Sequence, residues 1–153
     1  MKTTKLEKID ACSDAIEWVA TQKNYKEAWQ NCVRGEWMLW LAKMLKVNDR
    51  KLTLAKFKCA NQVRHLMKDP SSLAALDAAE KYGNGEISRD ELDTAAAAAY
   101  AAATADDAAA YAAYATYAAT YAATAKKESL KKSAEFCREI LTDDVLTAYK
   151  KLR

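Results

Sequence analysis

The chain of 153 residues is long enough for one domain with a single hydrophobic core, and it contains three glycines and one proline. An all-β fold needs many more turn residues, so this composition excludes it and favours helices. A net charge of +3 with 29% charged residues is too small a bias to indicate nucleic-acid binding, and it has the wrong sign for an acidic DNA mimic.

The first residues and the cysteines predict the compartment. The N-terminal segment MKTTKLEKID is charged and lacks the apolar stretch of a signal peptide. The chain contains four widely separated cysteines: Cys12, Cys32, Cys59 and Cys137. Because no export signal accompanies them, we expect reduced thiols and a cytoplasmic protein.

Apolar periodicity predicts short helices in the first 82 residues. The first is expected over residues 5–20. Asn24 is predicted to cap a second helix, which Gly35 is expected to end. Residues 37–42, with the sequence WMLWLA, begin a third helix that is apolar on all sides. Such a helix lies in the centre of a core or at an interface.

Cap and turn signals continue to the middle of the chain. The pair Asn48-Asp49 is predicted to cap a fourth helix, and Asp69-Pro70 to start a fifth that runs to about Lys81. Gly83-Asn84-Gly85 is predicted as a loop. The segment Ser88-Arg89-Asp90-Glu91 then has the pattern of a capping box, which opens the next helix.

The next helix is dominated by alanine. Residues 95–125 contain twenty alanines and five tyrosines. Because alanine has the highest helix propensity, we expect one long helix from Ser88 to about Ile140, followed by a short helix capped by Thr142 or Asp143. A membrane span over 95–125 is excluded because alanine is only weakly hydrophobic and the pair Asp106-Asp107 lies in mid-segment.

In an ideal helix the five tyrosines share a face about 120° wide. They are Tyr100, Tyr111, Tyr114, Tyr117 and Tyr121. Two interpretations stay open: the tyrosine stripe packs on the Trp-rich helices as core, or part of it is exposed and binds a partner. The stripe, with Lys126 and Lys127 after it, is the candidate partner-binding site. No two of the threonines are eleven residues apart, which argues against ice binding.

The chain offers little that is typical of catalysis. One histidine and scattered cysteines provide no Ser-His-Asp or Cys-His arrangement. Asp106 and Asp107 are adjacent and point about 100° apart in a helix, which argues against a paired acid and base. We therefore expect no catalytic residues and no cofactor.

Two sets of residues carry potential metal ligands. Residues 80–91 align with a calcium-binding EF-hand loop through Gly85 and Glu91, but Glu80 and Tyr82 fit the first and third positions poorly. The cysteines and His65 lack the closely spaced cysteine pair of a structural zinc site. The sequence therefore predicts no metal, and His65 is interpreted as structural.

Several segments, in conserved order along nearly the whole chain, resemble the Imm-five-like immunity proteins, a family of small helical proteins of bacteria, phages and prophages. These segments are ACSDAIEWV (11–19), EAWQNCVRGEWMLWLAKML (27–45), DRKLTLAKFKCANQVRHL (49–66), LAALDAAEKYGNGEISRDEL (73–92) and SAEFCREI (133–140). The most specific piece is RGEWMLWLA. The resemblance implies an inhibitor that neutralises a toxin by binding it, and no catalytic residue comes with it.

We therefore expect an all-α, single-domain protein over residues 1–153. A Trp-rich bundle of short helices (1–82) would pack on the long Ala/Tyr helix and a C-terminal helix (88–153). The expected function is a non-enzymatic inhibitor that occludes a toxin. The alternatives are a phage-encoded inhibitor of a host defence system such as a CRISPR effector, and a structural phage component that forms homo-oligomers. The expected partner is a protein, with no membrane and no nucleic acid.

Overall fold

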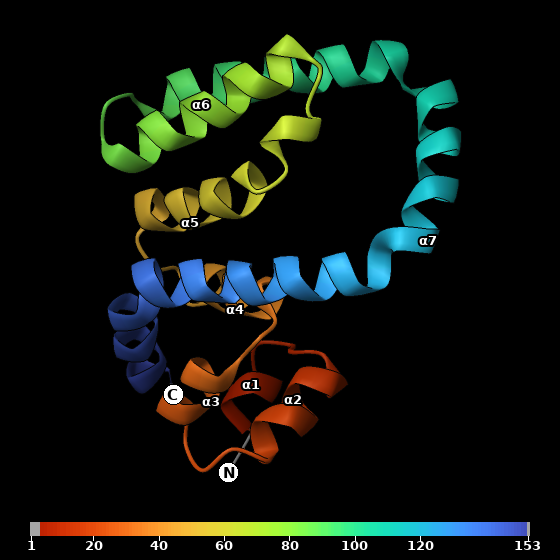
Figure 1. Ribbon diagram of the computed structural model, residues 1–153. Helices are drawn as coiled ribbons and strands as arrows, with labels where there is room; N and C mark the ends of the chain where they lie inside the picture. Colours follow the sequence, from red (N-terminus) through yellow and green to blue (C-terminus); the bar gives the residue numbers. More distant parts are fainter. Residues whose placement is uncertain (1–3, 153) are drawn as a thin grey trace.

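Short helices from the first half of the chain pack against one long helix that forms the second half (Figure 1). The computed structural model describes the backbone of residues 4–152 and the side chains of residues 5–99 and 127–152. The helices are α1 Thr4–Glu7, α2 Ser13–Ala20, α3 Tyr25–Asn31, α4 Gly35–Met44, α5 Asp49–Asn61, the 3₁₀ turn η1 Arg64–Leu66, α6 Pro70–Asn84 and α7 Arg89–Lys151. The described residues form no strand, and the all-α prediction is confirmed.

Side-chain caps begin four of these helices, as the sequence predicts. In each case the cap oxygen accepts a hydrogen bond from a backbone N–H of the first helical turn. The four caps are Asn24, Asn48, Asp69 and Ser88. At the start of α7 the Glu91 carboxylate also accepts a hydrogen bond from the Ser88 backbone N–H, which completes the capping box.

The prediction of one continuous helix over residues 5–20 is wrong, because the structure has two short helices there. Helix α1 ends at Glu7 and α2 begins at Ser13. Between them Asp10 has a φ of 58°, in the left-handed region where a right-handed helix cannot continue. The break turns α2 away from α1, so that the two short helices can contribute to different walls of one pocket.

Gly35 does not end the second helix as predicted. Helix α3 ends at Asn31, and Gly35 is the first residue of α4. A Cβ on Gly35 would lie 2.4 Å from the Cβ of Ser133 and 2.9 Å from its carbonyl carbon. The glycine is therefore needed for the close approach of α4 to α7.

The predicted loop at residues 83–85 is shorter than expected. Gly83 lies inside α6, where a Cβ would come within 2.8 Å of the Leu54 Cβ. Gly85 alone adopts the left-handed conformation, with a φ of 86°, and it ends α6. Gly83 thus serves the α5–α6 contact and Gly85 the turn.

Helix α7 continues to Lys151, so the predicted separate C-terminal helix is part of it. Thr142 does not cap a new helix, because its hydroxyl donates to the Arg138 carbonyl, 2.6 Å away, within α7. The same oxygen accepts the indole N–H of Trp29 at 2.8 Å. Figure 1 shows α7 changing direction before its last, dark blue turns. In Figure 1 the first turns of α7 run beside α6 and its blue turns run beside α4.

The core lies where α4, α5 and the last part of α7 meet. Its most enclosed residues, none more than 2% exposed, are Met38, Ala42, Ala55, Ala134, Cys137, Leu141 and Val145. Three of these seven are alanines, which lets the helix axes approach closely. We call these seven residues, together with Gly35, the α4–α5–α7 core.

Candidate functional site

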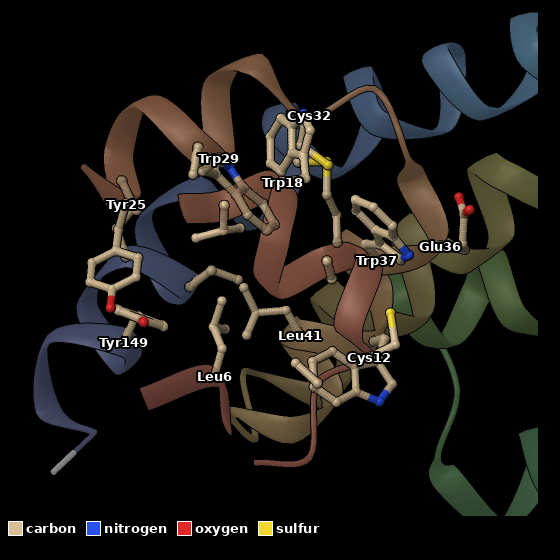
Figure 2. Close-up of a pocket in the computed structure, with 18 of the residues that line it drawn as sticks. Leu6, Cys12, Trp18, Tyr25, Trp29, Cys32, Glu36, Trp37, Leu41 and Tyr149 are labelled. Carbon is tan, nitrogen blue, oxygen red and sulfur yellow. The ribbon is translucent and has the colours of Figure 1, made fainter. Parts of the chain in front are cut away.

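An apolar pocket of about 400 Å³ opens between the N-terminal helices and the end of α7 (Figure 2). All four tryptophans of the chain line it: Trp18, Trp29, Trp37 and Trp40. We call it the Trp pocket. Its volume lies in the range of small-molecule and cofactor sites, which are typically ~300–1,000 Å³.

The pocket follows from helical periodicity. Three helices each direct residues spaced three and four apart at it, because such residues share one face. These sets are Ala15, Trp18 and Val19 from α2, Trp37, Trp40 and Leu41 from α4, and Val145, Leu146 and Tyr149 from α7. Helix α4 directs Ala42 into the core, and Met38 lies between the two regions, in the core and at the pocket wall.

The outer wall of the pocket is partly exposed and combines aromatic rings with one ion pair. The Trp18 and Trp37 ring centroids are 6.1 Å apart with planes tilted by 53°. The Arg34 guanidinium lies 4.1 Å from the Trp37 ring centroid, and its Nε donates to Glu36 Oε1 at 2.7 Å. Both ion-pair side chains are more than 40% exposed, so we expect the pair to add no more than about 1 kcal/mol of stability.

The inner end of the pocket is formed by two tyrosines, which Figure 2 shows on the side opposite Glu36. The ring centroids of Tyr25 and Tyr149 are 3.8 Å apart. Tyr149 is 4% exposed, and Lys5 Nζ donates to its backbone carbonyl at 3.3 Å. Burial raises the pKa of Tyr149, and the neighbouring Tyr25 hydroxyl adds to the shift. The phenol therefore stays protonated at neutral pH.

The Tyr149 hydroxyl is fully buried, and the Tyr25 side chain lies within hydrogen-bonding reach of it. Glu36 Oε2, on the opposite side of the pocket lining, is also buried and has no hydrogen-bond partner within the described residues. A buried polar group without a hydrogen bond costs about 1–3 kcal/mol.

Most of the candidate residues from the sequence analysis are not tested by the structure. The side chains of six of them are outside the described residues: Tyr100, Tyr111, Tyr114, Tyr117, Tyr121 and Lys126. The seventh, Lys127, is exposed on α7. Lys127 does not line the Trp pocket, and whether the tyrosine stripe is core or interface stays a prediction.

Three of the four cysteines gather in the core and the fourth does not. Cys32 and Cys137 are buried, Cys59 is half-buried, and Cys12 is exposed at the Trp pocket. A hydrogen bond between the thiols of Cys59 and Cys137 lowers the pKa of Cys59 and, with burial, raises that of Cys137. Within residues 5–99 and 127–152, no three His, Cys, Asp or Glu side chains come close enough to hold a metal ion.

The residues of the EF-hand alignment have other partners. The Tyr82 hydroxyl donates to Asp49 Oδ2 at 2.8 Å, and Glu91 accepts from the Ser88 backbone at 2.8 Å. Arg50 Nη1 donates to the carbonyls of Tyr82 and Ile87, at 2.6 and 3.1 Å. His65 is exposed on η1. These contacts join α5, α6 and the start of α7.

Periodicity identified residues 37–42 as central or interfacial but could not identify the pocket. The sequence does not indicate that residues 145–149, near the C-terminus, pack against the N-terminal helices and form one wall of the pocket. The available signal was the concentration of all four tryptophans between residues 18 and 40.

Comparisons with family models, curated proteins and solved structures found no match to this chain. Among the described residues, no helix combines the length and apolar character needed to cross a lipid bilayer. The class that fold and site define is an all-helical protein with an apolar pocket lined by tryptophan.

Proposed function

We propose that this protein is a non-enzymatic inhibitor that binds a partner protein and blocks it by occlusion. The observation that carries the proposal is the outer wall of the Trp pocket. It presents partly exposed tryptophans beside an arginine that is held in place by Trp37 and Glu36.

Tryptophan, tyrosine and arginine supply most binding hot spots in protein interfaces. A large ring held by its neighbours loses little conformational entropy when a partner docks, and the Arg34 guanidinium is already oriented by two contacts. An apolar side chain of the partner would enter between the rings, while an acidic group of the partner would pair with Arg34.

The resemblance to immunity proteins supports a toxin as the partner, in the cytoplasm of the producing cell. A host defence enzyme, including a CRISPR effector, is the alternative partner. Both partners would use the same outer wall, since occlusion depends on the binding surface and requires no chemistry from the inhibitor.

The test is co-expression with each toxin encoded beside the gene and with defence nucleases of the host. We expect rescued growth or lost nuclease activity for one of them, and a stable complex in size-exclusion chromatography. Trp37→Ala and Arg34→Ala should each weaken that complex about tenfold or more.

Met44→Ala is the matched control, because Met44 is an apolar side chain of α4 that is 39% exposed and does not line the pocket. Circular dichroism establishes that each variant is folded. A complex that tolerates Trp37→Ala and Arg34→Ala, or the absence of any inhibited partner, would contradict the proposal.

A further inference from the structure

Helices α5 and α7 run antiparallel, and two ion pairs at the surface show their register. Lys51 Nζ lies 2.9 Å from Asp144 Oδ1, and Lys58 Nζ lies 2.9 Å from Glu139 Oε1. Residue numbers on α7 therefore fall as those on α5 rise. The residue after Lys58, which is Cys59, lies beside the turn of α7 that precedes Glu139.

The Cys59 side chain faces the turn of α7 that carries Cys137. Cys59 Sγ lies 4.0 Å from the Ser133 carbonyl oxygen. A helical carbonyl points along the axis toward the residue four positions further on, and that residue is Cys137. Gln62 Nε2 supports this arrangement, since it donates to the Cys59 carbonyl at 3.1 Å and to Ser133 Oγ at 2.9 Å. The two thiols are in hydrogen-bonding contact.

The two thiols differ in their access to solvent. Cys59 is half-buried, whereas Cys137 has no exposed surface. The hydrogen bond with Cys137 lowers the pKa of Cys59 to about 7, so a large fraction of this thiol is ionised at neutral pH. The thiolate is the nucleophilic form of cysteine, and it attacks best when its pKa is near the ambient pH. Cys59 is therefore the reactive member of the pair.

We propose that Cys59 and Cys137 are a site of reversible oxidation by hydrogen peroxide, which joins α5 to α7 through a disulfide. In the first step the Cys59 thiolate attacks one peroxide oxygen. An S–O bond forms, the O–O bond breaks, and the departing hydroxide takes up the proton that the thiol released, giving water.

In the second step the Cys137 sulfur attacks the sulfur of the Cys59 sulfenic acid. The S–S bond forms, the S–O bond breaks, and hydroxide leaves with the Cys137 proton as a second water. The two thiols together lose two electrons, which reduce one peroxide to two waters.

Oxidation of Cys59 also favours the second step. In the reduced protein the hydrogen bond with Cys59 and burial raise the pKa of Cys137, and the negative charge of the Cys59 thiolate adds to the shift. The sulfenic acid carries no charge, so Cys137 loses its proton more readily once Cys59 is oxidised. The order of the two steps follows from this change.

The other two cysteines lack this arrangement and serve as controls. Cys32 is buried close enough to Cys137 to influence its pKa, but its own thiol is directed at the Arg34 carbonyl, 3.6 Å away. Burial raises the pKa of Cys32, which keeps its thiol protonated. Cys12 is exposed at the Trp pocket.

Peptide mapping by mass spectrometry tests the pair directly, because trypsin places the four cysteines in four different peptides. The reduced, folded protein is treated with hydrogen peroxide, its free thiols are alkylated, and it is then digested. We expect a disulfide between peptides 59–64 and 133–138 that forms before Cys12 is oxidised. A thiol reductant should remove it.

Three variants separate the roles of the thiols. Cys137→Ala should stop the reaction at the Cys59 sulfenic acid, which dimedone labels, and Cys59→Ala should leave Cys137 reduced. The matched control is Cys32→Ala, which removes a neighbouring buried thiol and should keep the disulfide. Circular dichroism establishes that each variant is folded. If Cys137→Ala does not fold, the mapping of the unmodified protein and of Cys59→Ala still decides the question.

Three results would overturn the inference. The first is the absence of the link between peptides 59–64 and 133–138 after peroxide treatment. The second is a link from Cys137 to Cys32 in its place, and the third is oxidation of Cys137 in Cys59→Ala at the unmodified rate. None of these results bears on whether a partner protein binds the outer wall, so failure of the two proposals can be distinguished.

Discussion

The α4–α5–α7 core and the Trp pocket share Met38 and Val145, yet they are packed in opposite ways. The core joins its helices through glycine and alanine, and several of its residues have no exposed surface. The pocket is surrounded by four tryptophans and still contains about 400 Å³ of open space. Small residues at helix contacts permit close approach, whereas large rings on short helices hold the backbones apart.

The largest expected difference comes from deleting one leucine in each region. Leu141→Ala in the core should lower the free energy of unfolding by about 3–5 kcal/mol, because the surrounding helices cannot collapse onto the cavity. Leu41→Ala at the pocket should cost less, about 1–2 kcal/mol, because Leu41 is partly exposed and already faces open space. Urea denaturation measures both, and equal losses would contradict the comparison.

Adding atoms should also destabilise the core more than the pocket. Ala55→Leu in the core should destabilise by about 1–3 kcal/mol, because Ala55 has no exposed surface and no room for a larger side chain. Ala15→Leu at the pocket should be neutral or stabilise by up to about 1 kcal/mol, since it fills part of the cavity. Thermal unfolding of the two variants provides the measurement. Destabilisation by both would mean that the pocket walls are as tight as the core.

Substitution of Gly35 tests whether the core requires the close approach of α4 to α7. Alanine usually stabilises a helix over glycine by about 1 kcal/mol. Gly35→Ala should instead destabilise by about 1–2 kcal/mol, because the new Cβ would meet Ser133 at 2.4 Å and force α4 from α7. The matched control is Gly83→Ala, whose Cβ meets Leu54 at 2.8 Å and should cost less. A more stable Gly35→Ala variant would show that the contact is not required.

The smallest expected effect is a loss of stability at acidic pH, through the helix caps Asp69 and Glu91. Hydrogen bonds from the Ser72 side chain and backbone lower the pKa of Asp69, and those from the Ser88 backbone and hydroxyl lower the pKa of Glu91, from ordinary values of 3.8 and 4.5. Since the folded pKa is the lower one, the stabilisation is present above these ordinary values. It is lost as pH falls through them toward the folded pKa values.

This acid effect should act on the starts of α6 and α7 and leave the Trp pocket unchanged. Urea denaturation between about pH 6 and 3 should show a small loss of stability that is reduced in a variant combining Asp69→Asn and Glu91→Gln. The tryptophan fluorescence of the folded state should stay constant over the same range. A pH dependence identical to that of the unmodified protein would show that these caps do not contribute.

The features that sequence predicted are those decided within one helical turn. Asn48 and Ser88 cap their helices through bonds to residues three positions away. The role of Gly35 depends on a residue distant in the chain, since the glycine is required by the close approach of Ser133. The pocket could not be predicted for the same reason, because Tyr149 meets Tyr25 only in the folded molecule.

The bond from the Trp29 indole to Thr142 joins residues 113 positions apart, and Arg138 also bonds the Cys32 carbonyl across 106 positions. A ribosome that has released the first four helices has therefore not yet made the helix against which they pack. The tryptophans of these helices stay exposed to solvent until the last twenty or so residues, which form the end of α7, leave the ribosome. We expect the growing chain to be sensitive to aggregation and to folding helpers until synthesis ends, and a chain shortened before residue 133 to accumulate in insoluble form.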